Sequence, residues 1–166
     1  MPILREGELD IISYSAEQTG RLGHRLGTLL SAGDVVCLSG DMGAGKTVFS
    51  GGVGRGWGAI HPLTSPTYNL VHQHQRRKDK QRLYHLDCYR LNGPEDADSI
   101  GLDDMLESDG IIVLEWAERL KPVLPRECLW IHIRVMEETR RNFVMEGDSA
   151  YYKSLIRRFR ALSFGF

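Results

Sequence analysis

The chain has 166 residues, of which 42% are hydrophobic, so it can bury one sizeable core and is short for two. We therefore expect a single domain spanning residues 1–166. The formal net charge is -1 and 26% of the residues are charged, which excludes the global basic field that supports autonomous binding of RNA or DNA.

The cysteines and the N-terminal segment bear on where the protein works. Cys37, Cys88 and Cys128 are odd in number, widely spaced and set among apolar residues, which is typical of buried free thiols in a reducing compartment and argues against a zinc site. Charged residues stand near the N-terminus where a signal peptide needs an apolar core, and no apolar run reaches membrane-spanning length. We expect a cytoplasmic protein that does not enter a membrane.

The first elements expected along the chain are a strand, a helix and a second strand. Residues 9–14 alternate weakly, as an edge strand does. Ser15 and Gln18 then form an S-x-x-Q capping box that opens an amphipathic helix. Residues 31–34 end this helix and lead into the apolar run 35–38, which predicts a strand.

A phosphate-binding motif follows this strand directly. Residues 40–47, Gly-Asp-Met-Gly-Ala-Gly-Lys-Thr, match the pattern G-x-x-x-x-G-K-[ST] at every defined position. Glycines without Cβ atoms let backbone N–H groups turn toward a phosphate, and the positive end of the following helix faces the same anion. Lys46 adds a mobile charge, and the Thr47 hydroxyl can join a magnesium shell. The alternative is a glycine-rich turn with a surface lysine.

The helix expected at residues 46–57 has an unusual composition. It contains Gly51, Gly52, Gly54 and Gly56, and each glycine costs about 1 kcal/mol relative to alanine in a helix interior. We therefore expect this helix to depend on close packing against the sheet or on bound nucleotide.

Two further strands, at residues 67–74 and 83–88, are joined by a polar run at residues 75–82. The run is most simply the solvated tip of a hairpin. Its basic residues are Arg76, Arg77, Lys78, Lys80 and Arg82. A basic contact surface for an acidic or phosphate-bearing partner is the alternative.

The remaining segments complete an α/β pattern. Residues 94–106 predict one or two short helices broken at Gly101, and the apolar run 111–114 is typical of a central strand in a parallel sheet. Further strands and a basic C-terminal helix are expected at residues 129–135, 143–145 and 151–162. The pattern predicts a P-loop NTPase-like α/β fold, with a mostly parallel sheet flanked by helices and an antiparallel hairpin or edge at residues 67–88.

Two carboxylates are candidates for the second half of a site. Hydrolysis needs a carboxylate for magnesium and an oriented water in addition to the phosphate loop. Glu115 ends the apolar strand, and Asp87 lies within the strand at residues 83–88. Taken singly, each could be a helix cap or an ion-pair partner. Together with the glycine loop, both are predicted to belong to the site.

A rigid corner supplies a third candidate. Pro66 forces Ser65 into an extended conformation, and Thr67 follows it. Such a corner can reach a γ-phosphate in the manner of a switch loop; the alternative is an ordinary loop before a strand. The strand-borne histidines lack metal-type clustering with cysteine, so we expect packed or surface roles for them. The guanine-recognition element N-K-x-D is absent, which favours ATP.

Four segments match one known family in order and spacing. They are residues 40–47, 65–71 (Ser-Pro-Thr-Tyr-Asn-Leu-Val), 85–91 (His-Leu-Asp-Cys-Tyr-Arg-Leu) and 114–116 (Leu-Glu-Trp). Together they resemble the TsaE-type ATPases, formerly the YjeE family, of bacterial tRNA threonylcarbamoyladenosine biosynthesis. The resemblance implies a small P-loop fold that binds ATP and Mg²⁺ and works with the TsaB and TsaD proteins. Those partners transfer a threonylcarbamoyl group to the adenosine beside the anticodon, so tRNA would be reached through the complex.

The resemblance also implies roles for matched residues. Thr47 and Glu115 would ligate magnesium, Asp87 would orient the hydrolytic or a metal-bound water, and Thr67 would belong to a switch-like loop. Trp116 would pack beside the nucleotide. The nucleotide-contacting positions would be Gly43, Ala44, Gly45, Lys46, Thr47, Val48, Arg140 and Thr19, with Arg141 as a competing alignment for Arg140. Val48 and Gly51 depart from the family's usual threonine and arginine, which bears on partner docking more than on nucleotide binding.

The expected function is that of a Mg-dependent ATPase subunit, weak alone and stimulated by its partners, required for N6-threonylcarbamoyladenosine modification at tRNA position 37. The alternative is a small-molecule kinase of the P-loop superfamily, in which the basic run at residues 75–82 would close over the acceptor. A third possibility is a nucleotide-binding scaffold without turnover.

Overall fold

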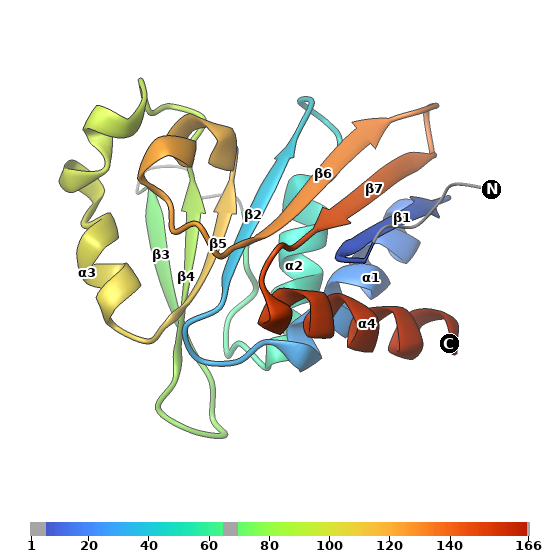
Figure 1. Cartoon of the computed structure of the whole chain (residues 1–166), viewed down its shortest axis with the longest axis horizontal. Helices are drawn as coiled ribbons and strands as arrows, with labels where there is room; N and C mark the ends of the chain where they lie inside the picture. Colours follow the sequence, from blue (N-terminus) through green and yellow to red (C-terminus); the bar gives the residue numbers. More distant parts are fainter. Residues whose placement is uncertain (1–5, 65–69, 166) are drawn as a thin grey trace.

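A twisted sheet runs through the centre of the computed structural model, which describes residues 6–64 and 70–165 (Figure 1). Its strands are β1 Glu8–Ser13, β2 Val35–Gly40, β3 Val71–Gln75, β4 Arg82–Asp87, β5 Ile111–Glu115, β6 Leu129–Val135 and β7 Arg141–Glu146. They lie in the order β1-β7-β6-β2-β5-β4-β3. The central strands β6, β2, β5 and β4 are parallel, and antiparallel strands extend both edges. The predicted α/β fold and the hairpin of β3 and β4 are confirmed.

Helices cover both faces of the sheet. The α-helices are α1 Ala16–Leu29, α2 Lys46–Trp57, α3 Leu102–Glu107 and α4 Ala150–Phe164, and the 3₁₀ helices are η1 Pro94–Asp96, η2 Asp98–Ile100 and η3 Ala117–Val123. Helices α1, α2 and α4 pack on one face. The 3₁₀ helices and α3 cover the other face over β2, β5 and β4.

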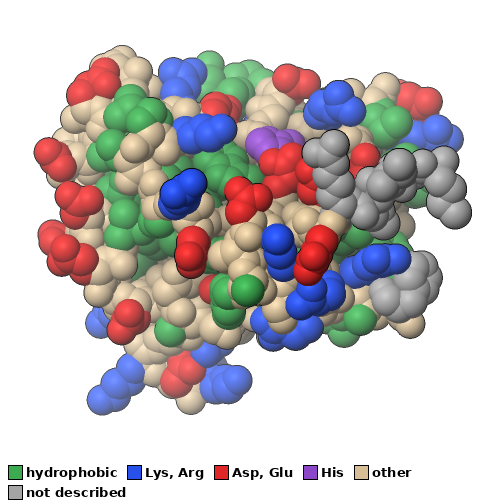
Figure 2. Space-filling model, viewed as in Figure 1, with side chains coloured by type: hydrophobic (Ala, Val, Ile, Leu, Met, Phe, Trp, Pro, Cys, Tyr) green, Lys and Arg blue, Asp and Glu red, His purple; other side chains and the backbone are tan. Residues whose placement is uncertain are grey.

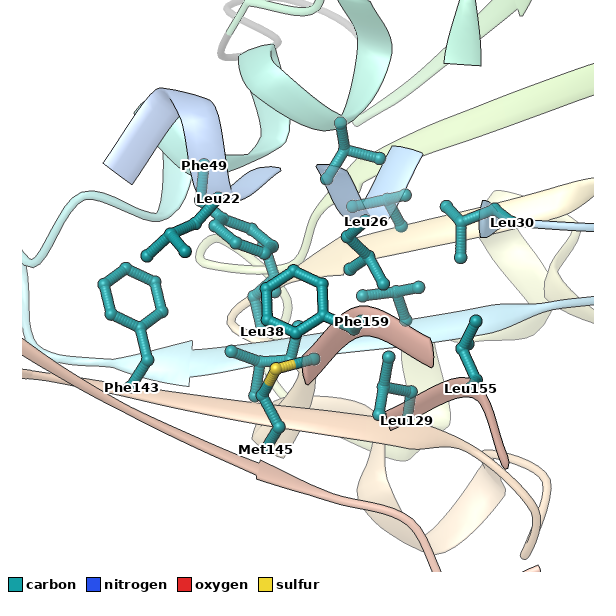
Figure 3. Packing of buried hydrophobic residues seen from close by; sticks show 14 of the residues in the cluster. Leu22, Leu26, Leu30, Leu38, Phe49, Leu129, Phe143, Met145, Leu155 and Phe159 are labelled. Carbon is teal, nitrogen blue, oxygen red and sulfur yellow. The ribbon is translucent and has the colours of Figure 1, made fainter. Parts of the chain in front are cut away.

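The alternation of side chains along β2 explains how one strand serves two cores. Val36 and Leu38 join the cluster beneath α1, α2 and α4, which Figure 3 shows at close range. Val35 and Cys37 point to the opposite cluster. Because both faces are buried, β2 and β5 read as continuous apolar runs rather than as alternating ones. The phosphate motif is therefore attached to the most buried part of the sheet.

Helices α1 and α2 touch backbone to backbone, which the sequence did not lead us to expect. A Cβ atom added at Gly52 or Gly56 of α2 would lie within 3.0 Å of the α1 backbone, at Gly20 and His24 respectively. Gly23 of α1 meets the backbone of α2 at Phe49 in the same way. The glycine-rich helix does pack closely, but Gly52 and Gly56 face a neighbouring helix instead of the sheet, and Gly51 and Gly54 face Leu63.

The tip of the hairpin, the turn between β3 and β4, lies at the opposite end of the sheet from the phosphate motif (Figure 1). Arg76 pairs with Asp79 through two hydrogen bonds of 2.6 and 2.8 Å, and its guanidinium carbon lies 4.9 Å from the ring centroid of Trp57. Trp57 ends α2, about 16 Å along the helix from Lys46 at 1.5 Å per residue. Figure 2 shows the Lys and Arg side chains that project from this tip.

Two further expectations concern the cysteines and membrane association. All three cysteines are buried free thiols, as predicted. Within the described ranges, no helix combines the length and the apolar character that crossing a bilayer requires.

Candidate active site

The phosphate motif forms the loop between β2 and α2. Gly43 and Gly45 have φ values of 76° and 102°, in the left-handed region that favours glycine, and Gly45 caps the N-terminus of α2. Ala44 between them is fully buried. The loop therefore turns sharply and delivers Lys46 and Thr47 to the first turn of the helix.

Lys46 is held across the mouth of this loop. Its Nζ atom donates to the carbonyl oxygens of Gly40 and Asp41 at 2.6 and 2.7 Å, and lies 4.0 Å from the ring centroid of Trp116. Burial lowers the pKa of Lys46 from its ordinary value, while surrounding carboxylates, Glu118 and Glu115 first, oppose that shift. The ammonium group thus lies in a partly desolvated position, where losing its hydrogen-bond partners would cost free energy.

Glu115 connects the end of β5 to the first turn of α2. The side chain is buried, and its Oε1 atom accepts a hydrogen bond of 2.8 Å from the Thr47 hydroxyl. Its Oε2 atom is 2.5 Å from Nε2 of His85. Carboxylate and hydroxyl oxygens are donors that suit Mg²⁺, so Thr47 and Glu115 fit the predicted metal site.

The two predicted carboxylates face the same side of the sheet. Asp87 is the cross-strand partner of Glu115 in the parallel pair of β4 and β5, and directly paired residues share a face. The Oδ1 atom of Asp87 accepts from the backbone N–H of Tyr89 at 3.0 Å. The pair is thereby brought to the end of the sheet where the phosphate loop lies.

A cleft of about 390 Å³ separates the loop from these carboxylates. Trp116 and Tyr89 form its aromatic side, with ring centroids 5.0 Å apart. Trp116 has a φ of 57°, uncommon for a residue with a bulky side chain. The cleft is lined by Met42, Gly43, Ala44, Gly45, Lys46, Thr47, Val48, Asp87, Tyr89, Glu115 and Trp116.

A second hollow, of about 270 Å³, lies on the other side of the phosphate loop. Thr19 of α1 lines it and is buried, with its hydroxyl 2.7 Å from that of Ser13. Val48 borders both hollows. Thr19 therefore lies across the second hollow from Gly43, Ala44 and Gly45, which also line the first cleft.

The two candidate arginines occupy different places. Arg140 pairs with Glu137 at 3.5 Å and lies 5.4 Å from the ring centroid of Tyr14. Arg141 donates to the carbonyl oxygen of Gly43 at 3.4 Å and lines the second hollow. The structure therefore brings Arg141, rather than the preferred Arg140, against the phosphate loop.

The prediction for Thr67 is not tested by the structure, and the prediction for the histidines was incomplete. Thr67 and its switch-like corner lie in residues 65–69, outside the described residues. The histidines are packed or partly exposed as expected, and no group of three or more His, Cys, Asp or Glu side chains in residues 6–64 and 70–165 could hold a metal ion. The contact between His85 and Glu115 was missed; the two-residue spacing from His85 to Asp87 was the signal available for it.

The chain was compared with known protein families and structures. A family model described as "Threonylcarbamoyl adenosine biosynthesis protein TsaE" matches residues 13–143. The TsaE protein of Treponema pallidum is 38% identical over 134 residues, covering 81% of this chain and 97% of that protein. The TsaE protein of Streptomyces coelicolor is 46% identical over 113 residues, covering 68% and 76% respectively.

A solved structure agrees with these sequence matches. The crystal structure of Bacillus subtilis YdiB superposes with a TM-score of 0.80 at 26% sequence identity, covering 94% of this chain and 96% of that one. The family match includes the phosphate loop, both carboxylates and the two arginines. The chain belongs to the TsaE family of threonylcarbamoyl adenosine biosynthesis proteins.

Proposed function

We propose that this chain, acting as one domain, binds and hydrolyses ATP with Mg²⁺ in the cleft beside the phosphate loop. The observation that carries this proposal is the bond of 2.8 Å from Thr47 to Glu115. It joins the residue that ends the phosphate motif to a buried carboxylate at the end of a central strand. A lone phosphate loop would bind an anion, whereas this pairing supplies oxygen donors for a cation as well.

The residues around the cleft divide the work between them. The loop from Gly43 to Thr47 holds the phosphates, and Lys46 exchanges its loop carbonyls for phosphate oxygens. Thr47 and Glu115 hold Mg²⁺, which when bound neutralises phosphate charge. Mg²⁺ usually takes one or two protein oxygens together with phosphates and water, so this small donor set is sufficient.

Asp87 acts next to this pair as the group that orients the attacking water. Its position as the cross-strand partner of Glu115 supports this role, and the family resemblance suggests Thr67 as its companion. On the other side of the loop, Thr19, Val48 and Arg141 contact the nucleoside side of ATP. Their place around the second hollow supports that assignment.

The hydrolysis serves tRNA threonylcarbamoyladenosine synthesis in the cytoplasm, through an assembly with TsaB- and TsaD-type proteins that contacts the tRNA. The names of the relatives support the pathway. Turnover by the isolated chain is slow and the assembly accelerates it, because isolated P-loop domains commonly leave the water and transition-state charge incompletely organised.

The position of the basic hairpin argues against the kinase alternative. A lid must reach the transferred phosphate, but this tip is fixed by Arg76 to Trp57, at the far end of α2 from Lys46. A phosphate acceptor would have to be held elsewhere.

The test compares Lys46→Ala with Lys80→Ala, an exposed lysine at the hairpin tip. ATP affinity is measured by calorimetry, and ATP turnover is measured alone, with candidate acceptors and with the TsaB–TsaD assembly. We expect Lys46→Ala to weaken ATP binding at least tenfold, since it removes a charge-assisted contact, and Lys80→Ala to match the parent. A folded Lys46→Ala protein with parental affinity, or transfer of phosphate to an acceptor instead of water, would overturn the proposal.

A further inference from the structure

His85 is buried directly behind the proposed magnesium ligand. It lies in β4 and is fully inaccessible to solvent. Its Nε2 atom is 2.5 Å from Oε2 of Glu115. Because a carboxylate can only accept, the hydrogen of this bond belongs to Nε2 of His85.

The strand register explains why the two side chains meet. His85 stands two residues before Asp87 in β4, so both side chains point to the face on which Glu115 lies. Glu115 is the direct partner of Asp87, which makes His85 its diagonal neighbour on the same face. The sheet thus places one polar group on the open side of Glu115 and another behind it.

Among the described residues, the bond to Glu115 is the side-chain hydrogen bond found for His85. Its other ring nitrogen, Nδ1, is buried without a hydrogen-bond partner in the described part of the chain. Burying an imidazole for one hydrogen bond contributes little to stability compared with an apolar side chain of similar volume. A contribution to the fold alone therefore does not account for a histidine here.

The two hydrogen bonds of Glu115 fix its carboxylate at both oxygens. Oε1 accepts from Thr47, the other proposed metal ligand, and Oε2 accepts from His85. With only the Thr47 bond, the carboxylate could rotate about its last torsion, which has a broad energy profile. Partners behind a metal ligand typically change metal affinity by 10- to 100-fold when removed.

We infer that His85 is a positioning residue, which orients the Glu115 carboxylate so that it and Thr47 present their oxygens to Mg²⁺. The inference rests on the proposed function, because it presupposes that Glu115 and Thr47 hold the cation. It assigns His85 no contact with ATP or with the attacking water. Its effect should therefore appear in the magnesium requirement and not in the affinity for nucleotide alone.

The experiment measures the affinity for a fluorescent ATP analogue as Mg²⁺ is varied. We expect His85→Leu to raise the half-saturating Mg²⁺ concentration about 10-fold or more, with affinity in excess chelator within about twofold of the parent. His85→Gln places an N–H near the position of Nε2 and should restore most of the magnesium response. His85→Asn is too short to reach Glu115 and should behave like His85→Leu.

His74→Leu is the matched control, since His74 is another buried strand histidine, and it should leave the magnesium response unchanged. If His85→Leu does not fold, the comparison of His85→Gln with His85→Asn decides the question, because both are amides. Equal magnesium requirements for these two variants, or a parental requirement in folded His85→Leu, would overturn the inference.

Glu115→Gln and Thr47→Val separate this failure from that of the proposed function. If both variants raise the magnesium requirement while the His85 variants do not, the metal site stands and the positioning role is wrong. If Glu115→Gln and Thr47→Val also respond to Mg²⁺ like the parent, the metal site itself is wrong, and the inference falls with it.

Discussion

The contact between α1 and α2 predicts opposite effects for the same substitution at adjacent positions. Gly51 and Gly52 both lie inside α2, so replacing either with alanine gains about 0.5–1 kcal/mol of helix stability. An alanine Cβ at Gly51 would meet its nearest neighbour, the carbonyl oxygen of Leu63, at 3.5 Å, an ordinary contact. At Gly52 it would enter the backbone of α1 at Gly20.

The magnitude follows from what must move to admit that methyl group. Relief at Gly52 requires the two helix backbones to separate by more than about 1 Å, because the added Cβ would meet the carbonyl oxygen of Gly20 well inside the 3.5–4.0 Å of ordinary contacts. Overpacking of this kind costs about 1–3 kcal/mol, and backbone yields less readily than a side chain. We therefore expect Gly52→Ala to destabilise the protein by about 1–2 kcal/mol net, and Gly51→Ala to stabilise it by up to about 1 kcal/mol.

Urea unfolding followed by circular dichroism measures both changes. The urea midpoint of each variant is compared with that of the parent. If the slope of unfolding free energy against urea concentration is unchanged, the shift in midpoint reports stability alone. Gly51→Ala controls for helix propensity, because it gains the same helix stability without bringing a methyl group against the backbone of α1. Midpoints that rise equally in the two variants would refute the argument that α1 and α2 are in backbone contact at Gly52.

Three further predictions concern the site and the core. Arg141→Ala should weaken ATP binding about tenfold in calorimetry while Arg140→Ala stays within twofold, because only Arg141 contacts the phosphate loop; the reverse order would contradict the structure. Asp87→Asn should lower ATP turnover by about 10²-fold or more with the partner proteins present, while the magnesium requirement stays near parental; parental turnover would exclude its role with water. Burial, with smaller contributions from neighbouring histidines, lowers the pKa of His74 to about 4. Since the unfolded chain then binds the proton more readily, stability should be full above pH 6.5 and fall toward pH 4, and an identical slope in His74→Leu would show that another group is responsible.

The sequence predicts the local half of the site better than the half assembled across the sheet. The phosphate loop could be found because its glycines, Lys46 and Thr47 are neighbours in the chain and act together. The strands that carry Asp87 and Glu115 were also recognisable, but their direct pairing depends on the parallel register of β4 and β5. His85 was expected to have only a packed or surface role, because its partner is 30 positions away in the chain.

Two other features escaped prediction for related reasons. The choice between Arg140 and Arg141 turns on a shift of one residue at the start of β7, and one residue reverses which face a strand side chain occupies. The glycines of α2 signalled a close approach, but the identity of the approaching element depends on the packing of α1, which also carries glycines on its facing side. Both outcomes are set by tertiary contacts and not by local pattern.

The same helix contact limits how the protein can respond mechanically to its ligand. Thr19 belongs to α1, the phosphate loop leads into α2, and the two helices meet through main-chain atoms at Gly23, Gly52 and Gly56. Side chains can repack to let helices slide more readily than main chains in direct contact can, so we expect these two walls of the proposed nucleotide site to move together. Under the proposed function, a structural change on hydrolysis would then be expected at the opposite wall, where Trp116, Tyr89 and the strand ends carrying Asp87 and Glu115 face the cleft.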